Sequence, residues 1–218
     1  VAMDESRSRF EETYEILVRA WRDEVFSFQG QYWSYKDVAI WPRPVQQPHP
    51  PVWMPVTGSK ESIEWAASRE IPITPGGSTA GLRSDTVRYY AECLAKHGKT
   101  ISPEHITMAA VTYVADSKAR AVEENAPYQL YFNRTLYSHG NVTETDLQRQ
   151  AGYVSEQASS YVRPENLAAA ARARDEFRGL TKEALAKRAE NMPWGTPDEV
   201  AERLIADAEA IGANTVLV

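Results

Sequence analysis

The sequence predicts an α/β fold whose parallel strands amount to half of an eight-stranded barrel. Short apolar runs alternate with longer stretches of helical periodicity, a pattern typical of parallel strands joined by helical crossovers. The runs lack the polar alternation of a half-exposed strand, which indicates burial on both faces. Four such runs follow one another along the chain, at residues 52–56, 71–74, 106–114 and 214–218.

The composition excludes several other classes of protein. The chain has 218 residues, a formal charge of −6 and 43% hydrophobic residues, as in an ordinary globular protein. Its scattered acidic charge argues against non-specific nucleic-acid binding, and no window approaches the roughly 18 apolar residues of a membrane span. The single cysteine, Cys93, cannot form an internal disulfide. We therefore expect one cytoplasmic domain over residues 1–218, with no nucleic-acid, membrane or metal partner.

The first fifty residues contain a predicted helix, two short strands and a connector. Apolar residues recur at helical spacing over 8–21, which predicts a helix. Residues 25–35 alternate around Gly30, which predicts two short strands and a turn. Five prolines in the eleven residues 41–51 exclude a helix and predict an extended connector.

The central part of the chain carries the strand and helix alternation. The strand 52–56 is followed by helix 60–69, with Ile63, Ala66 and Ala67 on its apolar side. The strands 71–74 and 106–114 enclose a longer helix over 82–97, and a further helix begins at 118 and ends near 131. This order predicts crossovers that cover the sheet.

A long segment then interrupts the pattern. Residues 133–193 hold no strand signal, and they predict polar helices near 144–161, 164–177 and 181–191. We interpret this segment as a helical insertion or lid. Thr196, Pro197 and Glu199 then form the signature of a helix start, and Gly212 ends that helix before the strand 214–218. Because this apolar strand stands at the very end of the sequence, we expect the chain to be a piece of a longer protein.

One loop has the features of a phosphate site. Gly58, Ser59 and Ser62 lie where the strand 52–56 ends and the next helix begins, and ligands of such folds bind on that side of the sheet. Helix N-termini offer unpaired N–H groups to anions. Gly76 and Gly77 end the next strand on the same face, where they let a flat ligand approach the backbone. The plainer alternatives are that Ser59 only caps the helix and that the two glycines form an ordinary turn.

Other reactive side chains give weaker signals. The histidines show no metal-ligand spacing: His49 and His97 are interpreted as structural, and His139 is the one that could face an active site. Cys93 is expected to be a small buried residue. Trp53 and Trp65 are expected in the core rather than against a cofactor.

Two stretches resemble the bacterial luciferase-like flavin monooxygenases. The first is the proline-rich connector of residues 41–53, followed by Thr57-Gly58-Ser59-Lys60-Glu61-Ser62-Ile63-Glu64-Trp65-Ala66-Ala67. The second is Trp194-Gly195-Thr196-Pro197-Asp198-Glu199-Val200, a helix start found before the last barrel strand of that family. The first stretch is the more specific, because the second occurs at the start of many helices.

The resemblance implies a (β/α)8 barrel of the luciferase type, usually a homodimer, that binds reduced FMN or, in some branches, a reduced deazaflavin. It implies that Gly58, Ser59 and Ser62 hold the cofactor phosphate and that the insertion is a mobile lid. The implied activity is the oxidation of a small organic substrate with O₂, and a separate reductase supplies the reduced flavin. No residue matches the family's catalytic histidine, so the catalytic residues stay unknown. A deazaflavin-dependent hydride-transfer enzyme and a non-catalytic flavin-binding relative remain as alternatives.

Overall fold

Four short parallel strands form the centre of the fold. The computed structural model describes residues 5–56, 59–76, 80–136, 172, 175–176 and 179–218. Strand β3 (Met54–Val56) pairs with β4 (Ile73–Pro75), and β5 (Thr107–Ala109) pairs with β8 (Thr215–Leu217), both in parallel. A parallel bridge between Ile73 and Ile106 joins the two pairs, so the order is β3, β4, β5, β8. The predicted parallel strands are therefore confirmed, but no closed sheet is seen among the described residues.

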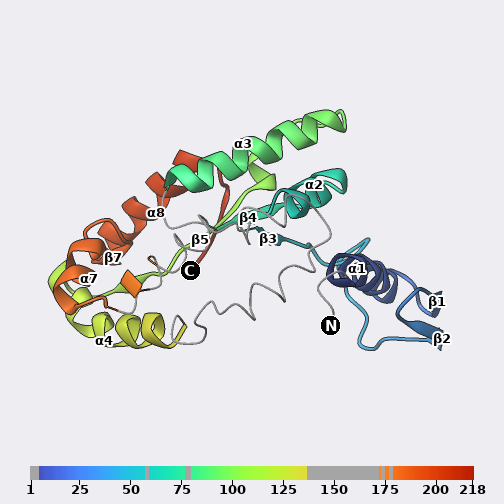
Figure 1. Ribbon diagram of the computed structural model, residues 1–218, viewed down its shortest axis with the longest axis horizontal. Helices are drawn as coiled ribbons and strands as arrows, with labels where there is room; N and C mark the ends of the chain where they lie inside the picture. The colour runs from blue at the N-terminus through green and yellow to red at the C-terminus, as the bar shows by residue number, and fades with distance from the viewer. Residues whose placement is uncertain (1–4, 57–58, 77–79, 137–171, 173–174, 177–178) are drawn as a thin grey trace.

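Three helices cover one face of these strands. Helices α2 (Lys60–Ser68), α3 (Ala80–Lys96) and α8 (Pro197–Ile211) pack against them, and α2 and α3 lie on the same side in Figure 1. The predicted apolar side of α2 is fully buried there. The largest fully buried side chains of this first core, each less than 2% exposed, are Tyr90, Ile73, Leu94, Ile106 and Met108. The core fixes the helix axes relative to the strand ends, where ligands of α/β folds bind.

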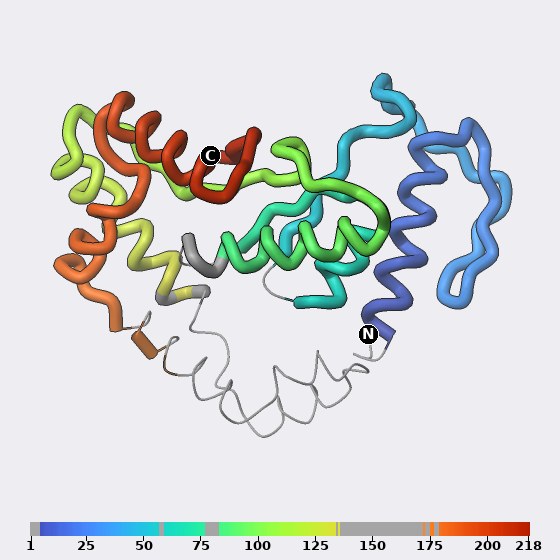
Figure 2. The backbone as a smooth tube through the Cα atoms, turned by 90° about the horizontal axis from the view of Figure 1, so that it is seen from above, coloured from blue at the N-terminus to red at the C-terminus, as the bar shows by residue number. Residues whose placement is uncertain are grey.

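A second, separate core lies at the other end of the molecule. It joins β6 (Tyr113–Val114) and β7 (Trp194–Gly195), a parallel pair, with helices α4 (Lys118–Leu136) and α7 (Lys182–Ala189). Trp194 is completely buried, and its indole N–H donates to the carbonyl of Val111 at 3.0 Å. Figure 2 shows α4 and α7 grouped at one end of the tube, with α8 leading back to the first core.

The N-terminal unit stands at the opposite end. It consists of α1 (Ser6–Arg22) and an antiparallel hairpin of β1 (Phe26–Gln29) and β2 (Ser34–Val38), as the sequence predicts. The proline-rich connector after it holds no helix or strand. A short 3₁₀ helix, Pro103–His105, precedes β5. No helix in the described part of the chain is long and apolar enough to cross a membrane.

The prediction of a single strand over residues 106–114 is wrong. The structure divides it into β5 and β6, which pair with different partners, β8 and β7. The break falls at residues 110–112, where the carbonyl of Val111 is used by the Trp194 indole instead of a neighbouring strand. The stretch contains no glycine or proline, and most of its residues are β-branched or aromatic, so the sequence carries no strong signal for the break.

Two further expectations differ from the structure. Trp53 is 44% exposed and does not lie in the core, because it precedes the first residue of β3, which pairs only with β4 among the described strands. Helix α4 continues five residues beyond the predicted end at Tyr131, to Leu136. Residues 137–171, which include the predicted helix 144–161 and the first half of the predicted helix 164–177, lie outside the described residues.

The start of α8 follows the predicted capping motif closely. The hydroxyl of Thr196 accepts the N–H of Glu199, and the Glu199 carboxylate accepts the N–H of Thr196 at 2.8 Å. Gly195 has φ +148°, and a Cβ at this position would lie 2.3 Å from Oε2 of Glu199. The capping box therefore requires glycine directly before it.

Gly195→Ala is expected to destabilise the fold by about 1–3 kcal/mol, because it adds steric overlap to backbone strain. Gly212→Ala is the matched control, since Gly212 also has a positive φ, +69°, but no atom lies within 4 Å of its added Cβ. Urea denaturation measures both. If Gly195→Ala lowers the free energy of unfolding by no more than Gly212→Ala does, the Glu199 side chain moves aside freely.

Residues 1–218 expressed alone are expected to self-associate. Within the described sheet, β3 and β8 each pair on one side only, and the exposed end of β8 carries Leu217 (54% exposed) and Val218 (80% exposed). Open parallel edges with apolar ends recruit further strands. Light scattering measures the mass, and a stable monomer at high concentration would contradict this expectation.

Candidate functional site

Two of the predicted phosphate ligands lie at the first turn of α2. The Ser59 hydroxyl accepts the N–H of Ser62 at 3.4 Å and caps the helix. The N–H groups of Lys60 and Glu61 belong to the same first turn, where no intrahelical acceptor exists. The turn follows the carboxyl end of β3, with Gly58 outside the described residues. Ser59 therefore does act as a cap, and the cap leaves neighbouring N–H groups for an anion.

Gly76 lies beside this turn but uses its own N–H in the sheet. Its N–H donates to the carbonyl of Val56 at 2.7 Å, which extends the β3–β4 pairing to the last residue of β3. The glycine therefore fixes the two strand ends side by side and does not offer that N–H to a ligand. Gly77 lies outside the described residues, so the structure leaves its predicted role untested.

Arg7 joins the site from the first turn of α1, 55 positions away from Ser62 in the sequence. Its Nη2 donates to the hydroxyl oxygen of Ser62 at 2.9 Å. Arg7 is half-buried and forms no ion pair with any described carboxylate. Sequence reasoning missed this residue, because helical spacing alone gives no indication of which helix an arginine on α1 meets.

Aromatic packing brings α1 to α2. Phe10 and Tyr14 approach Trp65 edge-on, with ring centroids 4.8 Å and 4.9 Å apart. The Arg7 guanidinium lies 5.6 Å from the centroid of the Phe10 ring. Edge-to-face contacts of this kind stabilise by about 0.5–1.5 kcal/mol each. The buried Trp65 thus belongs to the core, as predicted, and also sets how closely Arg7 approaches Ser62.

Hydrogen bonds and burial hold α2 against α3 on its other side. The Tyr89 hydroxyl donates to the Glu64 carboxylate, and this hydrogen bond raises the pKa of Tyr89. Cys93 is 1% exposed, as predicted, and burial raises the pKa of its thiol above the ordinary 9.0. Burial also raises the pKa of Tyr90, whose hydroxyl donates to the carbonyl of Ile71 at 2.9 Å. These groups are neutral at physiological pH. Charged side chains lie around them: Glu64 accepts the Tyr89 hydroxyl, and the Nζ atoms of Lys60 and Lys96 lie 5.3 Å and 6.0 Å from the centroid of the Tyr89 ring.

The stability of this interface is expected to fall in alkaline solution. Because the folded thiol of Cys93 has the raised pKa, the unfolded chain loses this proton first. The contribution of Cys93 to the free energy of unfolding is therefore fully present below the ordinary thiol pKa. It is lost as the pH rises through the pKa of the thiol in the folded state. The free energy of unfolding should fall as the pH rises above the ordinary thiol pKa of 9.0, and less in Cys93→Ala. An equal fall in both proteins would assign the effect to the tyrosines alone.

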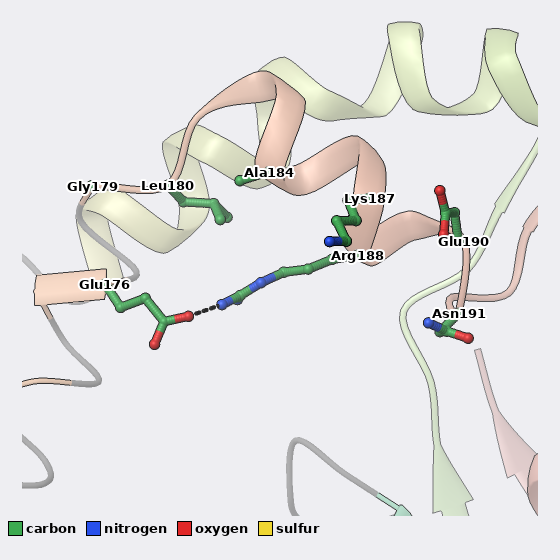
Figure 3. A pocket seen from close by; sticks show the side chains of 8 residues that line it. All are labelled: Glu176, Gly179, Leu180, Ala184, Lys187, Arg188, Glu190 and Asn191. Carbon is green, nitrogen blue, oxygen red and sulfur yellow. Dashed lines mark hydrogen bonds and ion pairs between the residues drawn. The ribbon is translucent and has the colours of Figure 1, made fainter.

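A concave feature lies on α7, away from the first turn of α2. This cavity of about 490 Å³ has Leu180 and Ala184 on its apolar side. Figure 3 shows Arg188 reaching across it to pair with the Glu176 carboxylate. Lys187 and Glu190 add one charge of each sign. The charges balance, and none of the residues predicted from the sequence lines this cavity.

Two of the described histidines have structural surroundings. The imidazole Nδ1 of His49 lies 2.7 Å from the carbonyl oxygen of Pro50, and the ring lies 6.0 Å from that of Trp21. Nδ1 of His105 accepts the N–H of Ser102 at 3.0 Å. His139 lies outside the described residues. No group of three or more metal-binding side chains gathers in the part of the chain that the structure describes.

The fold and the site together define a class of protein. Parallel strands joined by helical crossovers, with a serine-capped helix and an arginine at the carboxyl end of a strand, are typical of α/β proteins that bind anionic ligands. The family model of luciferase-like monooxygenases matches residues 1–215. The chain belongs to this family, which confirms the resemblance found in the sequence.

Individual relatives agree with this assignment. The FMNH₂-dependent dimethylsulfone monooxygenase of Pseudomonas putida is 26% identical, over 98% of this chain and 53% of its own length. The oxygenating constituent of 3,6-diketocamphane monooxygenase from Pseudomonas putida, solved with FMN, has a TM-score of 0.62 and 18% identity, over 97% of this chain and 56% of its own. The coenzyme F420-dependent tetrahydromethanopterin reductase of Methanopyrus kandleri has a TM-score of 0.55 and 15% identity, over 96% and 56%. The chain thus spans about half the length of these relatives.

Proposed function

We propose that this chain forms the phosphate-binding part of a flavin-dependent monooxygenase, which uses reduced FMN and O₂ to oxidise a small organic substrate. The observation that carries the proposal is the meeting of Arg7 and Ser62 at the first turn of α2. Family membership and the FMN-dependent relatives support the flavin, and the cation beside Ser62 supports a site for its phosphate. The incomplete barrel, with the insertion over residues 133–193 as its lid, is part of the same proposal.

The groups present fit a phosphate dianion. Lys60 and Glu61 cancel each other's charge in the first turn of α2, so Arg7 is the surplus cation. The Ser62 hydroxyl already accepts a hydrogen bond from Arg7 and keeps its own proton to donate. Free N–H groups and the helix dipole add to the attraction. Ser59, Ser62 and Arg7 would hold the phosphate, and Gly58, Gly76 and Gly77 would let the ligand approach the backbone.

Reduced flavin, when bound, supplies the electrons with which O₂ is activated. The residues of this chain bind and orient: the phosphate anchor fixes one end of the cofactor at the carboxyl ends of the strands. A separate flavin reductase and a second copy of the protein, in a homodimer, are the proposed partners.

A deazaflavin-dependent hydride-transfer enzyme is the second candidate. The fold similarity to a coenzyme F420-dependent reductase favours it. Absorption spectra of the cofactor that copurifies with the full-length protein distinguish the two. A non-catalytic flavin-binding protein would retain the cofactor and consume no O₂ with any substrate.

Removing the proposed phosphate ligands tests the site. Ser59→Ala combined with Ser62→Ala should weaken reduced-FMN binding by about 1–3 kcal/mol for each charged hydrogen bond lost, and Arg7→Ala by a similar amount. Anaerobic calorimetric titration of the full-length protein with reduced FMN and reduced riboflavin measures this. Riboflavin lacks the phosphate, so its affinity should stay the same in all variants.

Ser68→Ala is the matched control, because it removes a serine hydroxyl from the opposite end of the same helix. It should leave the FMN affinity unchanged. The proposal is wrong if the serine double variant binds reduced FMN as tightly as the wild type, or if the wild type binds both flavins equally.

A further inference from the structure

We propose that Glu12 is a positioning residue, which holds α1 in the orientation that brings Arg7 to the phosphate site. The inference rests on the proposed function and concerns how its site is assembled. Glu12 lies on α1, five residues after Arg7, and its side chain points to the β1–β2 hairpin rather than to α2. Its role would be exerted through Arg7, without contact to the ligand.

The attachment of α1 is unusual for a helix of 17 residues, because none of its residues is buried. Apolar burial normally supplies most of the stability with which a helix docks. Here Phe10 and Leu17 remain 39% and 40% exposed. The orientation of α1 therefore depends on a few directed contacts. The loss of one of them has a large effect on the position of the first turn of α1, which carries Arg7.

Glu12 makes the most extensive of these contacts. Its carboxylate accepts the N–H groups of Gln31, Tyr32 and Trp33 at 2.9–3.2 Å, so three consecutive amides of the hairpin turn enclose one negative charge. Hydrogen bonds to an ionised acceptor are about twice as strong as neutral ones. A Cβ on Gly30 would lie 2.0 Å from Oε1 of Glu12, so the turn has no room for a larger residue there.

The same hairpin turn also contacts the two residues that directly follow Arg7 in the sequence. The hydroxyl groups of Ser8 and Tyr32 lie 2.6 Å apart, and the Arg9 guanidinium lies 4.1 Å from the centroid of the Tyr32 ring. The amides that bind Glu12 thus belong to a turn that also contacts the first turn of α1. If Glu12 is released, the turn loses its anchor and Arg7 loses its fixed distance from Ser62.

A double-mutant cycle on the full-length protein tests this coupling. Glu12→Gln keeps the shape of the side chain but removes its charge and one acceptor oxygen, and we expect a three- to tenfold weaker affinity for reduced FMN with unchanged affinity for reduced riboflavin. In the Arg7→Ala background, Glu12→Gln should have no further effect on FMN. Glu15→Gln, which removes another carboxylate of α1 that is paired with Arg19, is the control and should change neither affinity.

Hydrogen exchange of the wild type provides a second measurement that needs no variant. Because coupling is reciprocal, FMN binding should strengthen the contact of Glu12 with the turn and slow exchange at residues 31–33, whereas riboflavin should not. Additive effects of Glu12→Gln and Arg7→Ala, or equal protection with both flavins, would overturn the role of Glu12. Failure of the proposed phosphate site would instead appear as equal wild-type affinity for FMN and riboflavin.

Discussion

The position of the candidate ligand groups depends on one constraint, which is that a parallel strand cannot return directly to its neighbour. The chain must leave the carboxyl end of β3 through a crossover helix, and that helix begins with N–H groups that lack an intrahelical acceptor. Ser59 satisfies one of them with its hydroxyl. The remaining groups lie at the end of the strand because the core holds Ile63, Ala66 and Ala67 of α2 in place.

The two sides of this junction are held by different physical interactions. Toward α3, burial dominates: Tyr90, Cys93 and Leu94 are at most 1% exposed, and the polar groups among them are hydrogen-bonded and neutral. Toward α1, burial contributes little, and hydrogen bonds and ring contacts determine the docking. The site is therefore assembled from a rigid half, which is part of the core, and a half that depends on polar contacts and is the more sensitive to single substitutions.

Much of the fold could be predicted because local signals agree with the tertiary structure. The buried runs of β3 and β4, the capping box at Thr196 and the glycine turn at Gly30 each have a local cause. The division of residues 106–114 could not be predicted, because it depends on the indole of Trp194, 83 positions after the carbonyl that it binds. Strand β7 was missed for a similar reason, since its two residues acquire their strand geometry only by pairing with β6.

The candidate site shows the same division between local and distant causes. Ser59 and Ser62 could be identified because capping and the strand-to-helix order are local features, whereas Arg7 depends on the packing of two helices that the proline-rich connector separates. The local charge explains why Arg7, which could not be identified from the sequence, matters most for the candidate site. The chain has a net charge of −6, and the first turn of α2 is itself neutral, so an anion would be repelled from this region without an added cation. Arg7 is the cation that α1 brings to the Ser62 hydroxyl, and for that reason the proposed phosphate site depends on the placement of α1.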